Sequence, residues 1–196
     1  MDNQPEVTGV ILAGGQGRRM HGKDKGLIAL AGKPLFLHVL TILAPQVNKV
    51  VISANRNIDV YQQQGVQVIQ DVLSDYPGPL AGMLSVMEGL ESNWFLFCPC
   101  DTPNIPPDLL SRLWNGRNTP AIKAVWVNDG ERDHPGIALL HASLKEPLRA
   151  YLASGERRVM QFLQYAGGHS VSFNGHKEAF ANINTPDDLS RLQVNC

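Results

Sequence analysis

The sequence has few cysteines, almost no net charge and no long apolar run. Its three cysteines are an odd number without the spacing of a disulfide framework. A formal net charge of -1 gives the chain no general attraction to nucleic acids or membranes. No apolar run approaches the length of a membrane span, and the polar start MDNQPEV is unlike a signal peptide. We therefore expect a cytoplasmic protein that acts on neither nucleic acids nor membranes.

Length and composition favour one domain over residues 1–196. A chain of 196 residues can bury one sizeable core, whereas two domains would each be small. Apolar residues make up 43% of the sequence and charged residues 18%, as in ordinary globular proteins. Because no long apolar stripe marks an interface, we expect a monomer.

Short apolar runs alternate with longer segments of helical periodicity. The runs rich in β-branched and aromatic residues, which we predict to be buried strands, are Thr8–Leu12, Lys49–Ala54, Val66–Gln70, Trp94–Cys98 and Lys123–Val127. The helices predicted between them are Pro34–Val47, Pro79–Leu90 and Pro107–Trp114. This alternation is typical of an α/β protein with a doubly wound, mostly parallel, Rossmann-like sheet.

The last third is less regular, and we expect an antiparallel element there. His134–His141 is predicted to run back beside the strand Lys123–Val127, and Ser170–Phe173 to form an edge strand. Three helices are predicted in this part: Leu144–Ala153, Val159–Tyr165, and a final helix with Thr185 as its N-cap and Pro186 as its first residue. We expect these segments to form a wall over the same cleft as the parallel strands.

The carboxyl ends of the parallel strands are where such a sheet binds ligands. In this chain they are Ala13–Gly17, Ser53–Arg56, Asp71 and Pro99–Asp101. The first belongs to the glycine-rich stretch Val10–Gly26, VILAGGQGRRMHGKDKG. It fails the dinucleotide fingerprint because Met20 stands at the third glycine, and it fails the P-loop pattern because Asp24 stands where a hydroxyl should reach magnesium.

A third interpretation takes this stretch as a backbone cradle. Leu12, Ala13, Gly14 and Gly15 end a strand in a turn with little side chain, so backbone N–H groups can approach a phosphate. Arg19 and Lys25 would then clamp a triphosphate, and Arg18 and Lys23 would be solvated charges. A solvated basic turn remains the alternative for all four cations.

The stretch resembles the signature of nucleotidyltransferases that activate small phosphorylated molecules, roughly L-A-G-G-x-x-x-R-M-G-x-x-K. The chain matches it at Leu12–Gly15, Arg19-Met20 and Lys25, with His21 in place of the usual glycine. Further blocks resemble the molybdenum cofactor guanylyltransferase family over nearly the whole chain: Asp71, Asp75–Met83, Cys98–Pro103, Asp129–Pro135, Gly155–Met160 and Asn182–Pro186. The resemblance implies a nucleotide-binding half at about 1–115 and an acceptor-binding half at about 116–196.

This resemblance implies transfer of GMP from GTP to the terminal phosphate of molybdopterin, with Mg²⁺ as cofactor and pyrophosphate as product. It also implies molybdenum-insertion proteins or molybdoenzyme chaperones as candidate protein partners. A phosphate oxygen is already ionised at neutral pH, so the reaction needs charge neutralisation and alignment more than a strong base. The alternatives are a cytidylyltransferase of the same cofactor, a sugar-phosphate nucleotidyltransferase and a non-catalytic GTP-binding regulator.

Asp101 is the predicted metal ligand, because it follows an apolar strand and Mg²⁺ prefers oxygen. An aspartate capping the following turn is the alternative. Ser53, Asn55 and Asp71 are predicted to contact the guanine edge or the ribose, although each could be an ordinary turn residue. Together with the cradle, Lys25 and Asp101, they complete the predicted GTP site.

The acceptor side is assigned to Arg157, Arg158, His134, Asn182 and Asn184. Two arginines at a helix start oppose the helix dipole, and a bound phosphate would explain them, whereas a salt bridge with Glu156 or Glu131 is the rival explanation. The two asparagines could supply a second oxygen to the metal or pair the entry to the last helix. Cys98 and Cys100 lack further ligands at matching spacing, so we expect buried thiols.

Overall fold

A seven-stranded mixed sheet organises the molecule. The computed structural model describes residues 5–15, 21–72 and 78–194. The strands lie in the order β5-β4-β1-β6-β8-β7-β9. Their bounds are β1 Val7–Leu12, β4 Lys49–Ser53, β5 Gln67–Ile69, β6 Trp94–Pro99, β7 Ala124–Asn128, β8 Asp133–His141 and β9 His169–Ser172.

Among these seven strands, β8 alone runs against the others. β1 pairs in parallel with β4 and β6, β4 with β5, and β7 with β9, whereas β8 is antiparallel to both β6 and β7. The predicted mostly parallel sheet with an antiparallel element in the last third is therefore confirmed. β9 pairs only with β7 in this sheet, as expected of an edge strand.

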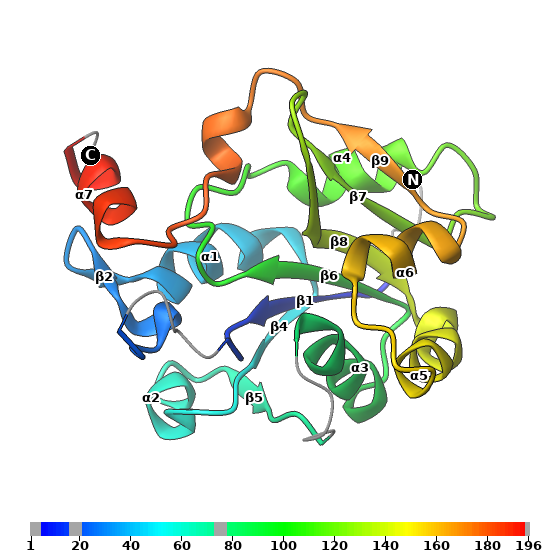
Figure 1. The fold of residues 1–196 in the computed structure, drawn as a ribbon, viewed down its shortest axis with the longest axis horizontal. Helices are drawn as coiled ribbons and strands as arrows, with labels where there is room; N and C mark the ends of the chain where they lie inside the picture. The colour runs from blue at the N-terminus through cyan, green and yellow to red at the C-terminus, as the bar shows by residue number, and fades with distance from the viewer. Residues whose placement is uncertain (1–4, 16–20, 73–77, 195–196) are drawn as a thin grey trace.

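Helices cover both faces of the sheet (Figure 1). One face packs on α1 Leu35–Leu43 and α4 Leu109–Gly116, and the other on α3 Pro79–Gly89, α5 Lys145–Ala153 and α6 Val159–Tyr165. The strand residues alternate between these two cores: Phe95 and Phe97 of β6 face α3, while Leu96 and Cys98 face α1 and α4. Cys98 and Cys100 are both buried, as predicted, and burial raises the pKa of each thiol.

Smaller elements gather at the end of the molecule toward which β1 and β6 point (Figure 1). They are the 3-10 helix η2 Lys25–Leu27, the hairpin of β2 Ala29–Leu30 and β3 Lys33–Pro34, and α7 Pro186–Val194. Leu30, Leu35 and Ile183 form a small core there. The remaining elements are η3 Ala44–Gln46, α2 Ile58–Gln62, η4 Ala142–Leu144 and η5 Lys177–Phe180. No helix in residues 5–15, 21–72 and 78–194 is long and apolar enough to cross a membrane.

Two predicted helix bounds were wrong for local reasons. The helix expected over Pro34–Val47 is α-helical only to Leu43 and continues as η3, because Pro45 has no N–H for an α-helical hydrogen bond. The helix expected from Pro107 begins at Leu109, because the chain before it forms a turn in which the Leu109 N–H donates to the Pro106 carbonyl. The hairpin β2–β3 and helix α2 were not predicted.

The carboxyl ends of β1, β4 and β6 meet at one edge. Leu12 lies opposite Ser53 on one side and Pro99 on the other. The ends are joined by hydrogen bonds from the Ala13 N–H to the Ser53 carbonyl (2.7 Å) and from the Cys100 N–H to the Leu12 carbonyl (3.0 Å). Because β1 lies between strands reached by connections in opposite directions, this edge is the topological switch point of the sheet.

Candidate active site

Three polar side chains from distant parts of the chain meet beyond the end of β6. The Lys25 ammonium donates to Asp101 Oδ2 at 3.1 Å and to Asn184 Oδ1 at 2.9 Å. The Lys25 and Asp101 side chains are 23% and 14% exposed, so solvent screens this pair only partly. The prediction placed all three residues in one cleft but did not foresee that the cation and the carboxylate would bind each other.

The segment between η5 and α7 delivers Asn184 to this cluster. The Ile183 N–H donates to the Asp101 carbonyl at 2.9 Å, and the Thr102 hydroxyl donates to Asn182 Oδ1 at 2.8 Å. Asn182 therefore fastens the segment to the loop after β6, as in the alternative role given for it, pairing the entry to the last helix. Figure 1 shows this segment passing near the end of β6 on its way from η5 to α7.

A capping box fixes the backbone of Asn184. Asp188 accepts from the N–H groups of Asn184 and Thr185, both at 3.0 Å, and the Asp188 N–H donates to Thr185 Oγ1 at 3.2 Å. These bonds, above all that from Asn184, lower the pKa of Asp188. Thr185 is thus confirmed as the N-cap and Pro186 as the first residue of α7.

The glycine segment opens onto solvent after β1. Leu12 is half-buried and Ala13 is buried, whereas Gly14 and Gly15 are exposed. A Cβ on Gly15 would meet no atom within 4 Å, and neither glycine has a positive φ. These glycines therefore leave open space beside the backbone, as a phosphate cradle requires, and are not needed for an unusual conformation.

Of the two predicted cations that the structure describes, Lys25 lies at the site. Lys23 is exposed. Gly17, Arg18 and Arg19 lie outside the described residues, so the proposed role of Arg19 stays a prediction.

Asn55 and Asp71 form a second polar group at the same edge. Asn55 Nδ2 donates to Asp71 Oδ2 at 3.0 Å, and the Asp71 N–H donates to Asn55 Oδ1 at 2.9 Å. Asp71 Oδ1 is buried and has no hydrogen-bond partner among the residues that the structure describes. A Cβ on Gly14 would come within 3.4 Å of Asn55 Nδ2, so this pair borders the glycine segment.

Ser53 lies beneath this pair and is 2% exposed. A Cβ on Gly82 would approach Ser53 Oγ to 2.9 Å, so α3 packs directly on the serine. The Ser53 side chain is therefore covered by the protein and has little exposed surface for the predicted contact with a nucleotide.

The oxygens around Lys25 suit Mg²⁺. Asp101 supplies a carboxylate and Asn184 an amide oxygen, and a cation already bridges the two. No group of three or more His, Cys, Asp or Glu side chains able to hold a metal occurs within the described ranges. A site with one carboxylate matches Mg²⁺ bound largely through substrate phosphates and water, so the donor set fits the predicted ion.

His134 is held by a local network beyond β7. Its Nε2 lies 2.7 Å from Asp129 Oδ2, and its ring packs on Phe180 with centroids 5.5 Å apart. Asp129 also accepts from the N–H groups of Glu131 (2.8 Å) and Arg132 (2.9 Å). Burial alone would raise the pKa of Asp129, but the bonds from His134 and these amides outweigh it and lower the pKa to about 2.

The two predicted acceptor arginines belong to the connection between α5 and α6. Both helices pack on the same face of the sheet as α3 (Figure 1). Arg157 donates to the carbonyls of Leu152 (3.0 Å) and Glu156 (2.7 Å), and Arg158 is exposed as the residue before α6. Glu131, one of their suggested partners, lies 2.6 Å from Lys177.

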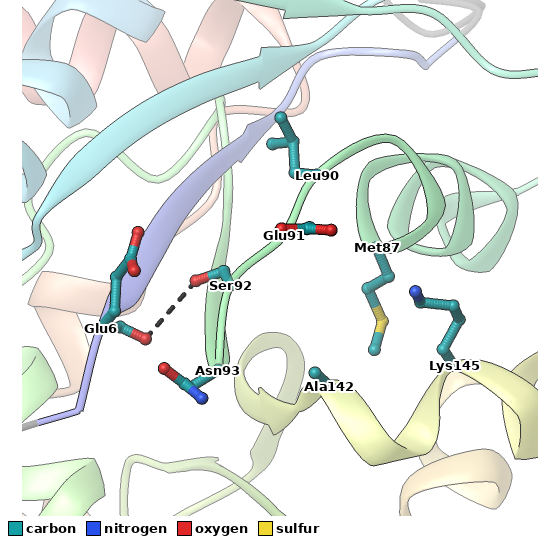
Figure 2. Close-up of a pocket in the computed structure, with 8 residues that line it drawn as sticks. All are labelled: Glu6, Met87, Leu90, Glu91, Ser92, Asn93, Ala142 and Lys145. Carbon is teal, nitrogen blue, oxygen red and sulfur yellow. Dashed lines mark hydrogen bonds between the residues drawn. The ribbon is translucent and has the colours of Figure 1, made fainter.

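A pocket of about 330 Å³ lies at the opposite edge of the sheet (Figure 2). Its lining includes Glu6, just before β1, and Asn93, just before β6, so it lies at the amino ends of the strands. A second pocket, of about 650 Å³, lies between the turn that holds Asp129 and the segment that includes η5. The cluster of Lys25, Asp101 and Asn184 lies outside both linings.

Arg56 is a candidate that the sequence interpretation left unassigned. Its guanidinium donates to the carbonyls of Gly22 (3.0 Å) and Gly15 (3.2 Å), so it links the two described ends of the glycine-rich stretch. Arg56 belongs to the strand-end range Ser53–Arg56, and that position was the available signal. Its partners are backbone carbonyls, which no residue pattern reveals.

The fold and the site define a class of protein. A doubly wound sheet with a glycine segment, a lysine and an aspartate at its switch point is the arrangement of a nucleotidyltransferase. The model of the MobA-like NTP transferase domain matches residues 9–178. The chain belongs to this family of MobA-like NTP transferases, and it is a nucleotidyltransferase enzyme.

Curated relatives match nearly the whole chain. The chain is 47% identical over 188 residues to the molybdenum cofactor guanylyltransferase of Serratia proteamaculans (strain 568), covering 96% of this chain and 94% of that one. It is 48% identical over 185 residues to the protein of the same name in Yersinia pestis (strain Pestoides F), covering 94% of each chain. The fold matches the crystal structure of molybdopterin-guanine dinucleotide biosynthesis protein A from Archaeoglobus fulgidus, with a TM-score of 0.76, 24% identity and coverage of 96% and 98%.

Proposed function

We propose that this nucleotidyltransferase transfers GMP from GTP to the terminal phosphate of molybdopterin, with Mg²⁺, and releases pyrophosphate. The observation that carries the proposal is the cluster of Lys25, Asp101 and Asn184 beside the open glycine segment. The names of the curated relatives, which match nearly the whole chain, supply the nucleotide and the acceptor.

In this proposal the backbone N–H groups of Ala13–Gly15 face the phosphates of GTP. Lys25 and Arg19 neutralise charge on the triphosphate, and Asn55 with Asp71 contacts the guanine edge or the ribose. Asp101 and Asn184 hold Mg²⁺, which supplies further charge neutralisation when bound. When GTP and Mg²⁺ bind, Lys25 would move from Asp101 to the phosphates. Each member of the present ion pair would then have a new partner of opposite charge, the phosphates for Lys25 and Mg²⁺ for Asp101.

The chemical step needs no protein nucleophile. An oxygen of the acceptor phosphate forms a bond to the α-phosphorus of GTP, and the bond from that phosphorus to the bridging oxygen breaks. The bridging oxygen leaves with its electron pair as part of pyrophosphate. Because the attacking oxygen is already ionised, the site has to align it and offset the crowded negative charge.

The acceptor would approach from the side of the last third of the chain, toward Arg157, Arg158, His134 and Asn182. Arg158 is the member of this group that is exposed at a helix start. His134 and Asn182 already have protein partners, so any contact with the acceptor would add to those bonds.

The test is a nucleotide competition assay with the purified protein, Mg²⁺ and molybdopterin. GTP, CTP and ATP are supplied in turn, and pyrophosphate and dinucleotide are measured. We expect product with GTP; product with CTP alone would identify a cytidylyltransferase. Tight GTP binding without any product, despite a competent acceptor, would contradict the proposal and favour a non-catalytic GTP-binding regulator.

A further inference from the structure

Asp24 is a buried carboxylate within the glycine-rich stretch, and it is only 9% exposed. Its Oδ1 accepts from the Tyr61 hydroxyl at 2.7 Å and the Gly26 N–H at 3.2 Å, and its Oδ2 accepts from Asn57 Nδ2 at 3.0 Å. Three donors converge on two oxygens, which suits a group that only accepts hydrogen bonds. In the sequence, Asp24 served only to exclude the P-loop pattern; in the structure its carboxylate is turned inward, toward Tyr61.

Tyr61 reaches Asp24 from a rigid position. It is fully buried on α2, and its ring packs edge-to-face on Phe36 of α1 with centroids 4.8 Å apart. Burial, the hydrogen bond to Asp24 and the charge of Asp24 raise its pKa, so the hydroxyl keeps its proton. A Cβ on Gly26 would lie 2.3 Å from the hydroxyl oxygen, so only glycine leaves room for this contact.

This network lies next to Lys25 in the chain. Asp24 is the N-cap of η2, and Lys25 is its first residue. The Leu27 N–H donates to the Asp24 carbonyl at 3.1 Å, and the Ile28 N–H donates to the Lys25 carbonyl at 3.2 Å. The backbone of Lys25 is therefore fixed on both sides, and its ammonium reaches Asp101 and Asn184 from that fixed point.

We propose that Asp24 and Tyr61 are positioning residues that hold Lys25 at the active site. The proposal rests on the transferase function proposed above for its kinetic consequence, but its structural part does not. Burying a carboxylate among neutral donors costs free energy. A functional role would explain why the protein has this unfavourable burial. Holding the Lys25 cation within reach of the phosphates is such a role, because small displacements at such sites lower rates strongly.

The first experiment measures the position of Lys25 without any substrate. Amine labelling of the unliganded protein, followed by mass spectrometry, gives the rate at which each lysine reacts. We expect Tyr61→Phe and Asp24→Asn each to raise the labelling rate of Lys25 about tenfold, the effect of losing one partner of a buried hydrogen bond. Lys49 and Lys145, at the opposite edge of the sheet, serve as internal controls and should react as in the wild type.

The second experiment measures kinetics. We expect Tyr61→Phe to lower kcat for GMP transfer about tenfold, and to lower it no further in a Lys25→Ala background, because coupled residues are not additive. Tyr165→Phe is the matched control, since the Tyr165 side chain is 74% exposed, and it should keep wild-type kcat. A merely structural role of Tyr61 would instead give the same loss in both backgrounds.

Wild-type labelling of Lys25 in both Tyr61→Phe and Asp24→Asn would overturn the proposal, as would an equal kinetic loss with and without Lys25. Asp24→Asn nearly preserves side-chain size, so it serves if Tyr61→Phe does not fold. If the wild type transfers no GMP, the proposed function fails, while the labelling result still decides whether Asp24 and Tyr61 position Lys25.

Discussion

Two aspartates at the strand ends of this sheet are satisfied in opposite ways. Asp101, after β6, is bound by Lys25, a side chain 76 residues away, and its loop is fastened by Asn182, 80 residues from Thr102. Asp129, after β7, is bound by His134 and by two backbone N–H groups, all within five residues. The first arrangement depends on the whole fold, and the second is almost complete within one turn.

This difference separates a candidate catalytic carboxylate from a structural one. The hydrogen-bond donors of Asp129 belong to its own turn and would not have to be displaced by a ligand, and its side chain is 1% exposed. Asp101 is paired with an ammonium at the end of a long side chain, and a metal ion can replace this ammonium while the backbone of Lys25 stays in place. A carboxylate at a strand end is therefore a stronger functional candidate when its partner is a distant side chain that can be exchanged than when its partners are local backbone groups.

The largest expected effect comes from exchanging the two carboxylates for amides. Asp101→Asn should lower kcat about 10²–10³-fold, because it removes charge where the transition state needs a bound cation, and should change the free energy of unfolding by less than about 1 kcal/mol. Asp129→Asn should instead lower the free energy of unfolding by about 2 kcal/mol, because it weakens a buried network. Pyrophosphate release and urea unfolding measure the two quantities.

The two variants also test whether Asp101 and Asp129 have different roles. Equal losses of kcat in both variants would contradict the distinction between a catalytic and a structural aspartate. A raised KM for molybdopterin in Asp129→Asn, with kcat unchanged, would support the proposed contact of His134 with the acceptor.

A smaller effect, about 10²-fold in kcat/KM for GTP, is expected for Lys25→Ala, because one positioned cation on the phosphates is lost. Lys23→Ala is the matched control, since Lys23 is two residues away and exposed, and it should behave as the wild type. Steady-state kinetics at fixed Mg²⁺ measures both. Equal losses in the two variants would mean that the stretch acts through its total charge and not through the placement of Lys25.

The smallest effect concerns pH. The pKa of Asp129 is lowered from 3.8 to about 2, so its ionised form stabilises the folded state by about 2 kcal/mol, at roughly 1.4 kcal/mol per pH unit. This contribution is fully present above about pH 4 and is lost as the pH falls through about 2. The difference in unfolding free energy between the wild type and Asp129→Asn, measured by urea unfolding, should therefore shrink over that interval. A constant difference would show that the charge of Asp129 is not the source of the stability.

Most of the sheet could be predicted because buried parallel strands are continuous apolar runs, as in Trp94–Cys98. What could not be predicted were elements too short to have a period. The hairpin β2–β3 has two residues in each strand, and α2 begins after Asn57, which has a left-handed φ of 52°. The inward turn of Asp24 depends on Tyr61, 37 residues away, and no local pattern contains that information.

The sequence predicted that several candidate site residues lie near the same strand ends, but it did not predict the contacts between them. The strand-end rule located Asp101, Asn55 and Asp71. The interpretation of the glycine-rich stretch as a cradle added Lys25, and the resemblance added Asn184. The ion pair of Lys25 with Asp101 and the reciprocal hydrogen bonds of Asn55 with Asp71 are tertiary contacts, which join residues distant in the sequence. The link from Arg56 to the glycine carbonyls is likewise visible only once the chain is folded.

The segment that carries Asn184 is synthesised long after the strands whose ends it contacts. Asn184 lies 159 residues after Lys25, and its neighbour Ile183 bonds to the Asp101 carbonyl. A ribosome therefore completes β1, β4, β5 and β6, with their glycine segment and Asp101, well before the residue that joins them at the strand ends. A nascent chain can have most of its parallel sheet while still lacking an assembled active site.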